Sequence, residues 1–471
     1  MATLRDDPTP VDRSRARVED ALADGEAHYG INTGFGALAQ TQVPRDELET
    51  LQRNFVFSHA VGVGDLVPKD LSRLILRLKI HALGLGYSGA SRTTFDRLLL
   101  FAERDLIPAI PSRGSVGASG DLAPLAHLAL PLLGEGQFWT ADGTDVRPAA
   151  EVLDEHDLAP ITLQPKDGLA LINGTQQMSG YGAHVLHEAR RLVKITDLLS
   201  AMSLEALQGS ITPFDERVHA VRPHPGAQQV AANVRTLLTD SEILESHRNC
   251  GKVQDPYCLR CVPQVHGASR DALRHATQIV EREINSVTDN PLVFEDGDII
   301  SAGNFHGQPL ALALDYAGIA LAELASISER RIYLLLEGHD GLPELLMEDT
   351  GLNSGYMMPQ YTAAALVSEN KSLTHPASVD SIPIGAVQLL DILDNVERVL
   401  AIELLTAAQA LDYRLPLRPG RGVEIAHETV RRTIPHREED YLLEDDIDQS
   451  LAFVRAHTLL EPVADELEPL G

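Results

Sequence analysis

A glycine-rich segment, Gly114-Ser115-Val116-Gly117-Ala118-Ser119-Gly120-Asp121, runs directly into the apolar stretch Leu122-Ala123-Pro124-Leu125-Ala126-His127-Leu128-Ala129-Leu130. Asp121 is a typical helix N-cap residue, and Pro124 is tolerated in a first helical turn. A buried helix is therefore predicted to begin after Asp121. The triplet Ala118-Ser119-Gly120 is expected at a rigid, strained turn beside the N-terminus of that helix.

This triplet is able to turn itself into an electrophile. The amide nitrogen of Gly120 can attack the carbonyl carbon of Ala118 if the backbone bends sharply, and glycine allows that approach because it has no side chain. Loss of water closes a five-membered ring, and a second dehydration at Ser119 leaves a methylidene-imidazolone. The alternative is structural, because Gly, Ser and Ala in a row usually form only a flexible turn.

Around this triplet the chain resembles the aromatic amino acid ammonia-lyases, in which such a triplet forms the catalytic prosthetic group. The resemblance covers nearly all of the 471 residues and is carried by further segments: Tyr29-Gly30-Ile31-Asn32-Thr33-Gly34-Phe35-Gly36, Ser58-His59-Ala60-Val61-Gly62-Val63-Gly64, Ala170-Leu171-Ile172-Asn173-Gly174-Thr175-Gln176, Gln254-Asp255-Pro256-Tyr257-Cys258-Leu259-Arg260-Cys261, Gly303-Asn304-Phe305-His306-Gly307-Gln308-Pro309 and Ala401-Ile402-Glu403-Leu404-Leu405.

Long helical patterns dominate the chain. Apolar residues recur at three- and four-residue spacing over residues 183–208, 269–285, 308–336 and 386–411, which predicts a bundle of long helices. A Gly-, Asp- and Pro-rich stretch between Gly134 and Gly168 predicts a short β-containing excursion. The fold class is therefore mainly α, with a loop-rich, electrophile-bearing region at residues 1–190 and a helical bundle at 191–471. The resemblance implies the same architecture, assembled as a homotetramer with shared active sites.

The charge balance is strongly acidic, with 68 Asp and Glu against 39 Lys and Arg and a formal net charge of −29. Lysine is scarce, and it occurs at Lys69, Lys79, Lys166, Lys194, Lys252 and Lys371. An acidic excess with few lysines suits a cytoplasm rich in salt, where self-repulsion is screened. A halophilic source is therefore a hypothesis. Loss of assembly or activity at millimolar salt is the behaviour it predicts.

Several function classes are disfavoured by the sequence. An acidic surface repels nucleic acid and anionic lipid. The glycine-rich segments have neither the lysine of a phosphate loop nor the spacing of a dinucleotide fingerprint. The N-terminus has no apolar core of the kind a signal peptide needs, and no uncharged stretch reaches the length of a membrane span. We therefore expect a cytoplasmic protein that acts on a small molecule.

Three cysteines, Cys250, Cys258 and Cys261, lie close to His247 in the sequence. The pattern could be read as a four-ligand zinc site. The segment lacks the turn glycines of typical zinc knuckles, so buried reduced thiols are the preferred interpretation. No metal and no external cofactor are expected.

An ammonia-lyase needs a base and a clamp for the substrate carboxylate besides its electrophile. The resemblance implies that Tyr29 is the base, which requires hydrogen bonds or positive charge that stabilise the phenolate. Arg260 is the carboxylate clamp, because a planar guanidinium can hold both oxygens at once, and its apolar context suggests a buried pocket wall. Asn173, Gln254 and Tyr257 are matched to a polar cage, and Phe305 to another wall. Taken alone, Tyr29 and Phe305 would be ordinary packing residues.

The choice of substrate depends on the pair Ser58-His59. The pair is similar to that of histidine-specific members of the family, where the histidine faces the substrate ring, and a neutral imidazole can donate to or accept from a second imidazole. The resemblance therefore implies L-histidine as substrate and trans-urocanate and ammonia as products. His59 taken alone would more often be a structural histidine.

The chain departs from the family after Ser378-Val379-Asp380-Ser381. The family usually continues through a polar stretch containing Gln-Glu-Asp, whose glutamate contributes to histidine turnover, whereas here Ile382-Pro383-Ile384-Gly385 leads straight into the next helix. Asp391 or Asp394 could substitute for that glutamate, or another loop could. Two alternatives therefore stay open: a lyase or aminomutase acting on tyrosine, phenylalanine or another amino acid, and a catalytically impaired homologue with a structural or binding role.

Overall fold

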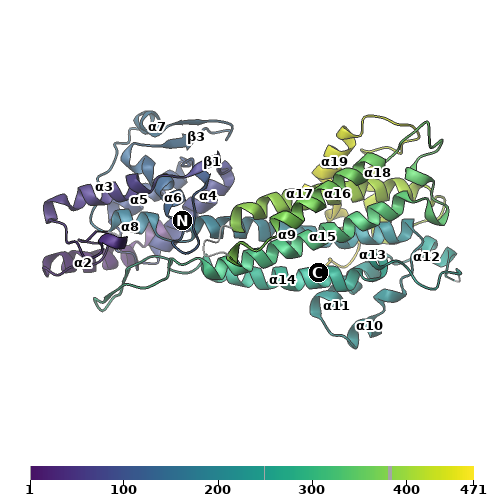
Figure 1. The fold of residues 1–471 in the computed structure, drawn as a ribbon, viewed down its shortest axis with the longest axis horizontal. Helices are drawn as coiled ribbons and strands as arrows, with labels where there is room; N and C mark the ends of the chain where they lie inside the picture. Colours follow the sequence, from purple (N-terminus) through teal and green to yellow (C-terminus); the bar gives the residue numbers. More distant parts are fainter. Residues whose placement is uncertain (1, 35, 249, 380–384) are drawn as a thin grey trace. The chain divides into compact units, whose positions relative to one another are not determined.

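The computed structural model describes residues 2–34, 36–248, 250–379 and 385–471, and helices form most of it (Figure 1). The chain divides into two compact units. The first contains residues 1–184, 277–314 and 376–387, and the second contains residues 185–276, 315–375 and 388–471. Each unit is thus built from separate stretches of sequence, whereas the sequence suggested a continuous division after Arg190.

The first unit contains mostly short helices and all of the strands found among the described residues. Its helices are α1 Ala2–Asp6, α2 Thr9–Ala23, α3 Leu48–His59, α4 Lys69–Gly84, α5 Arg92–Glu103, α6 Leu122–Ala129, α7 Ala149–Glu155 and α8 Asp167–Ile172. Its strands form antiparallel pairs of β1 Val63–Leu66 with β2 Pro111–Arg113, β3 Gln137–Trp139 with β4 Val146–Pro148, and β5 Leu292–Val293 with β6 Ile299–Ile300. The β3–β4 pair confirms the predicted β-containing excursion.

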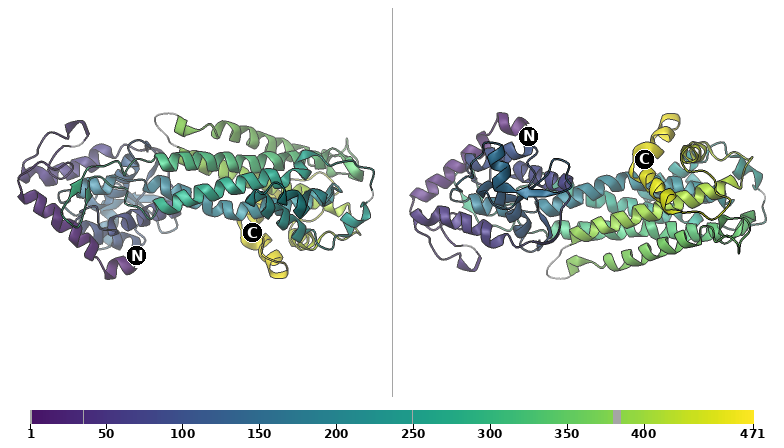
Figure 2. Two further views of the ribbon diagram at one scale, coloured as in Figure 1. Left: turned by 90° about the horizontal axis from the view of Figure 1, so that it is seen from below. Right: turned by 90° about the horizontal axis from the view of Figure 1, so that it is seen from above.

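Four long helices contribute residues to both units: α9 Gln176–Ala206, α14 Val262–Glu283, α15 Gln308–Leu336 and α17 Gly385–Asp412. The second unit adds α10 Glu216–Ala220, α11 Pro225–Leu237, α12 Glu242–Ser246, α13 Tyr257–Arg260, α16 Met357–Leu373, α18 Arg421–Arg431, α19 Glu444–Arg455 and α20 Glu461–Glu466. In the second unit the long helices run alongside one another as a bundle (Figure 1, Figure 2). The predicted mainly α fold is confirmed.

The four predicted long helices are present, but their ends differ from the prediction. Helix α15 has the predicted bounds, whereas α9 begins before residue 183. The glycines in the first turns of α9 are weak helix formers. They are used for close packing, since a Cβ on Gly180 would lie 2.9 Å from Ile75 Cγ1 and one on Gly182 would lie 2.8 Å from Leu314 Cδ2. Tertiary contacts therefore override the local preference there.

Helix α15 is, among the residues that the structure describes, the one helix long and apolar enough to cross a membrane. Its most apolar window is 61% buried inside the protein. That burial is typical of a core helix.

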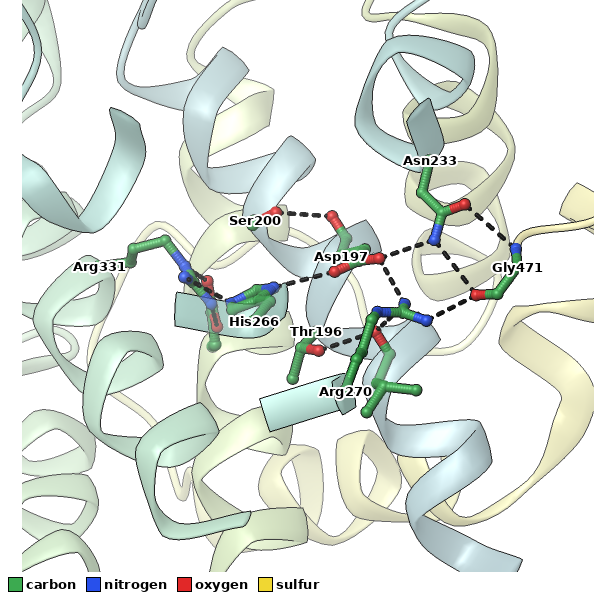
Figure 3. Close-up of polar contacts among 10 residues, drawn as sticks. Thr196, Asp197, Ser200, Asn233, His266, Arg270, Arg331 and Gly471 are labelled. Carbon is green, nitrogen blue, oxygen red and sulfur yellow. Dashed lines mark hydrogen bonds and ion pairs between the residues drawn. The ribbon is translucent and has the colours of Figure 1, made fainter. Parts of the chain in front are cut away.

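A buried polar network lies in the core of the second unit (Figure 3). The carboxylate of Asp197 accepts hydrogen bonds from His266 Nδ1 at 2.9 Å, Arg270 Nη2 at 2.5 Å and Asn233 Nδ2 at 2.8 Å. Burial opposes the ionisation of Asp197, but Arg270 and His266 hold its pKa below the usual range. Arg331 is fully buried and forms a bidentate ion pair with Glu403, in which Nε and Nη2 of the arginine donate to the two carboxylate oxygens at 2.5 and 2.8 Å. Buried charges in this core are therefore paired, as burial requires.

The acidic C-terminal stretch, residues 438–446, contains both exposed and buried acidic residues. Residues 438–443 precede α19, and Asp446 within the helix is buried and forms an ion pair with Arg437 at 3.0 Å. Leu451 is buried, whereas Leu442 is 70% exposed. Asp446 therefore helps to anchor the stretch to the fold.

Candidate active site

The Ala118-Ser119-Gly120 triplet lies in a tight hairpin of the first unit. The amide of Ser119 donates to the carbonyl of Val116 at 2.8 Å, and Val116 pairs with Gly120 as an isolated antiparallel bridge. Ala118 and Ser119 are half-buried, whereas Gly120 is buried. The chain thus reverses direction within five residues, which is the sharp bend predicted from the sequence.

Gly120 occupies a position that no other residue fits. Its φ is +74°, in the left-handed region that favours glycine. A Cβ at this position would lie 2.6 Å from the carbonyl oxygen of Gly174 and 2.8 Å from that of Phe305. The backbone of the triplet is therefore enclosed by two segments that are distant in sequence. Both of these segments contain residues of the predicted site.

Asp121 fixes the end of this hairpin to helix α9. It precedes α6, as predicted, but its side chain does not cap that helix. Its carboxylate instead accepts hydrogen bonds from Gln177 N at 2.7 Å, Met178 N at 3.1 Å and Ser115 Oγ at 2.5 Å. The carboxylate caps α9 because that helix start has unpaired amides close by. Burial raises the pKa of Asp121 to about 6, although these three donors favour the carboxylate.

The start of helix α15 holds the other side of the hairpin. The amide of Gly307 donates to the carbonyl of Gly117 at 2.8 Å. A Cβ on Gly307 would lie 2.3 Å from Met178 Cε, so glycine permits this close approach. The triplet is consequently held between the first turns of α9 and α15.

Asn173 lies beside the hairpin but does not point its amide nitrogen at the triplet. Its Nδ2 donates to the carbonyl of Asn290 at 2.8 Å. The following carbonyl, that of Gly174, accepts from Asp121 N at 2.8 Å. Asn173 is therefore next to the triplet, as expected, and it connects the hairpin to the segment around residue 290.

A buried charged cluster behind the hairpin was not identified from the sequence. Lys79 donates to the carbonyl of Asn173 at 2.5 Å, and Lys166 forms an ion pair with Asp289 at 2.8 Å. Burial lowers the pKa of Lys79 to about 7, opposed by Asp289. A signal was available, because the chain has only six lysines and Lys79 lies in the apolar run Leu78-Lys79-Ile80. A lysine kept in such a place in an arginine-rich chain indicates a specific contact.

His59 is the last residue of α3 and is half-buried. Its Nδ1 lies 2.8 Å from the carbonyl of Phe55 and therefore donates to it. The same loop is held to the triplet region, since Gly62 N donates to His127 Nε2 at 3.0 Å and Val63 pairs with Arg113. Burial lowers the pKa of His127, which keeps its ring neutral and able to accept.

Tyr29 lies in a turn of the first unit and is half-buried. Its hydroxyl oxygen accepts a long hydrogen bond, 3.4 Å, from Gly36 N. Phe305 is also half-buried, and its carbonyl contacts Gly120. The first unit thus contains Tyr29, His59, Asn173, Phe305 and the triplet.

The three other predicted site residues belong to the second unit. Arg260 is half-buried, with its Nε donating to the carbonyl of Asp255 at 2.9 Å and its guanidinium 4.5 Å from the ring centre of Tyr257. Tyr257 is 72% exposed, and Gln254 is exposed. Gln254 and Arg260 line a surface hollow of about 710 Å³. Within the second unit, the expected buried wall is therefore an open surface.

The cysteines differ from the prediction in one respect. Cys258 is buried, but Cys250 is exposed and Cys261 is half-buried. His247 has one ring nitrogen 2.7 Å from the carbonyl of Ile243 and the other 3.0 Å from that of Gly209. Both nitrogens of the histidine in the zinc interpretation thus face protein carbonyls.

The shortened connection after Ser378 lies mostly outside the described residues. Residues 380–384 are among those not described, so the predicted run through Ile382 has no structural account. Helix α17 begins at Gly385. Asp394 forms ion pairs with Arg398 at 2.8 Å and with Arg455, while burial opposes its ionisation and the two arginines hold its pKa low. Asp394 is therefore poorly suited to replace the missing glutamate.

Comparisons with known proteins agree on one family. The model of the family described as aromatic amino acid lyase matches residues 7–432. The chain belongs to the aromatic amino acid lyase family. A histidine ammonia-lyase of Anaeromyxobacter sp. (strain K) is 52% identical, over 93% of this chain and 91% of the relative.

Solved structures of this family have the same fold. The histidine ammonia-lyase of Trypanosoma cruzi is 39% identical with a TM-score of 0.89, over 97% of this chain and 89% of its own. The tyrosine aminomutase of Streptomyces globisporus is 35% identical with a TM-score of 0.90, over 98% of this chain and 94% of its own. The resemblance and fold class expected from the sequence are confirmed.

Proposed function

We propose that this lyase is a histidine ammonia-lyase, which eliminates ammonia from L-histidine and gives trans-urocanate. The observation that carries the proposal is the hairpin at residues 116–120, in which Gly120 is enclosed by the carbonyls of Gly174 and Phe305. Histidine ammonia-lyases at about half identity over nearly the whole chain support the choice of substrate.

The hairpin fits the self-formed prosthetic group of the family. Ring closure joins Gly120 N to the carbonyl carbon of Ala118 with loss of one water, and Ser119 loses a second. The reversal of the chain between Val116 and Gly120 brings these groups onto one short turn, and the absence of a side chain on Gly120 leaves the nitrogen accessible. When formed, the methylidene-imidazolone supplies an electrophile that the twenty ordinary side chains lack.

Tyr29 is the proposed base that removes the β proton of the substrate. The N–H of Gly36 donates to its oxygen, a contact of the type that stabilises a phenolate. The half-buried position of Tyr29 leaves its hydroxyl in contact with the protein while limiting solvent access. The base is thus held by its contact with Gly36.

His59 is the residue proposed to recognise the side-chain ring of the substrate. Because its Nδ1 donates to the carbonyl of Phe55, the neutral ring carries its lone pair on Nε2. That nitrogen can accept a hydrogen bond from the N–H of an imidazole. The tautomer therefore suits histidine better than the apolar ring of phenylalanine.

Arg260 is the proposed clamp for the substrate carboxylate, with Gln254 and Tyr257 beside it. Its Nε donates to the carbonyl of Asp255, so the two terminal nitrogens of the guanidinium would bind the substrate carboxylate. All three residues lie on an open surface of the second unit. We propose that they complete the active sites in a homotetramer, which works in the cytoplasm without an external cofactor, metal, membrane or nucleic acid.

A second candidate is an aminomutase or lyase acting on tyrosine. Two observations support this candidate. The fold is similar to that of a tyrosine aminomutase, with a TM-score of 0.90, and the connection after Ser381 is short. Substrate assays separate the two candidates. Growth of urocanate absorbance with L-histidine supports the first, and coumarate, cinnamate or a β-amino acid from the other substrates supports the second.

The Ser119→Ala variant tests the catalytic assignment. Alanine cannot lose the second water, so turnover of L-histidine should be abolished. The fold should persist, because Ser119 is half-buried in a turn whose backbone contacts do not need its hydroxyl. Circular dichroism and melting temperature check the fold. Turnover at the parent's rate would refute the proposal, and no product from any amino acid with the parent chain would leave only a structural or binding role.

A further inference from the structure

Lys79 is a fully buried lysine that the mechanism above does not use. It lies on α4, and its ammonium donates to the carbonyl of Asn173 at 2.5 Å. The charged groups that face it are Asp289, Lys166 and Asp121. The Oδ2 of Asp289 is already bonded to Lys166, so the described hydrogen bond of Lys79 is to a peptide carbonyl. A buried ammonium is costly, and such a placement requires a specific contact.

The peptide that Lys79 holds adjoins the one whose carbonyl encloses the triplet. Asn173 is followed by Gly174, whose carbonyl accepts from Asp121 N at 2.8 Å and lies against Gly120. Any shift of the Asn173–Gly174 peptide would therefore move the wall behind the attacking nitrogen of Gly120.

The same anchor reaches the other wall of the hairpin. The side chain of Asn173 donates to Asn290 O at 2.8 Å, and Asn290 Oδ1 accepts from Ala302 N at 2.6 Å. Residue 302 leads into the segment that carries Phe305, whose carbonyl is the second contact of Gly120. Both carbonyls that enclose Gly120 are thus connected to Asn173, and Lys79 holds Asn173 from behind.

Charge balance explains why a cation occupies this place. Asp121 and Asp289 are buried carboxylates, and Lys166 alone would leave them one positive charge short. In its protonated form Lys79 supplies that charge, and Asp289 and Asp121 both favour this form against the effect of burial.

We propose that Lys79 is a positioning residue for formation of the prosthetic group: by holding the Asn173 carbonyl, it fixes the adjoining Gly174, whose own carbonyl then stays against Gly120, so that the triplet stays bent for ring closure. This inference rests on the proposed function, since it concerns the same triplet. It assigns a role to a residue that does not touch the substrate.

The test compares Lys79→Met with Lys69→Met in the full-length protein. Lys69 is a matched control, because it is a buried lysine on the same helix whose partners, Asp105 at 2.7 Å and Ala141 O at 3.0 Å, lie away from the triplet. Folded, assembled material is isolated by size exclusion, and its intact mass is measured. We expect Lys69→Met to be fully dehydrated and Lys79→Met to contain uncyclised chains, with turnover per folded chain lower by on the order of 10- to 100-fold.

A role in folding alone would give a different result. Folded Lys79→Met would then be fully dehydrated and as active per chain as the parent, which would overturn the proposal. Lys79→Gln is the second variant, since its amide keeps a donor for Asn173 without the charge, and partial dehydration is expected. If neither variant folds, the role is in folding and the proposal is also overturned. A parent chain that is itself not dehydrated would instead refute the proposed function.

Discussion

Gly120 is the residue on which the local geometry depends most. Its positive φ and its two carbonyl neighbours leave no volume for a side chain. The sequence could predict the need for a glycine here, because ring closure requires an accessible nitrogen. It could not predict that Gly174 and Phe305 supply the enclosing carbonyls, since these contacts join segments far apart in the chain.

The Gly120→Ala variant tests whether steric overlap with the neighbouring carbonyls adds to the cost of placing alanine at a positive φ. Alanine in the left-handed region costs roughly 1 kcal/mol, and at Gly120 its Cβ would also overlap two carbonyl oxygens. Gly25→Ala is the matched control, because Gly25 has a φ of +80° and nothing within 4 Å of an added Cβ. We expect Gly25→Ala to lower the melting temperature slightly and retain activity. Gly120→Ala should lower it more and lose activity. Equal effects would contradict the described enclosure.

The helices show which sequence patterns carry structural information. The long apolar patterns predicted α9, α14, α15 and α17, but α16 was not identified. The buried face of α16 includes Gln360 and Asn370, which bond to Glu329 at 2.8 Å and to Asn395 at 3.0 Å. A helix that buries polar side chains shows no apolar stripe, so periodicity could not identify it.

The same limit applies to the candidate site. The motifs identified Tyr29, His59, Asn173, Phe305 and the triplet. The structure places all of them in the first unit, whereas the expected division after residue 190 put Phe305 in the helical bundle. The motifs did not reveal Lys79 or the capping role of Asp121, because each acts through a backbone group of a distant segment.

The junction of α9 and α18 gives a pH-dependent prediction. Glu205 is buried and accepts hydrogen bonds from Gly420 N, at 2.8 Å, and from Ser241 Oγ, both neutral donors. Burial raises its pKa to about 7 from an ordinary value of 4.5. The folded state therefore binds more protons than the unfolded state between these two pH values, and the free energy of unfolding should fall as pH rises through this window.

The Glu205→Gln variant should remove that slope. It should also gain stability above pH 7, by up to about 3 kcal/mol. Glu403→Gln is the contrast, since it would leave buried Arg331 without its charge partner and should destabilise by about 3–5 kcal/mol. Chemical denaturation at pH 5 and pH 8 measures both. An unchanged slope in Glu205→Gln would contradict the assignment of the proton to Glu205.

At the scale of the whole molecule, charge is the dominant feature. A net charge of −29 makes the chain repel copies of itself. The repulsion acts over a longer distance as salt is removed, because the screening distance is about 3 Å at 1 M and about 30 Å at 0.01 M. Exposed apolar residues on α15, Leu312, Tyr316 and Ile319, lie at helical spacing and are candidates for burial in an assembly.

Salt should therefore control the assembly. We expect a homotetramer in molar potassium chloride that dissociates and loses activity at millimolar salt, measured by light scattering and the urocanate assay. Sucrose of equal osmolality is the control, because it does not screen charge and should not restore the tetramer. A tetramer that is stable and active at millimolar salt would contradict the halophilic hypothesis, and a monomer at high salt would contradict the proposed assembly.

The intact mass of the freshly purified parent chain tests the central claim most directly. If Ala118, Ser119 and Gly120 close into the ring, the polypeptide is lighter than its translated sequence by two waters, and fragmentation places the loss on the peptide that contains them. A full-length, folded chain with the unaltered mass would contradict the account.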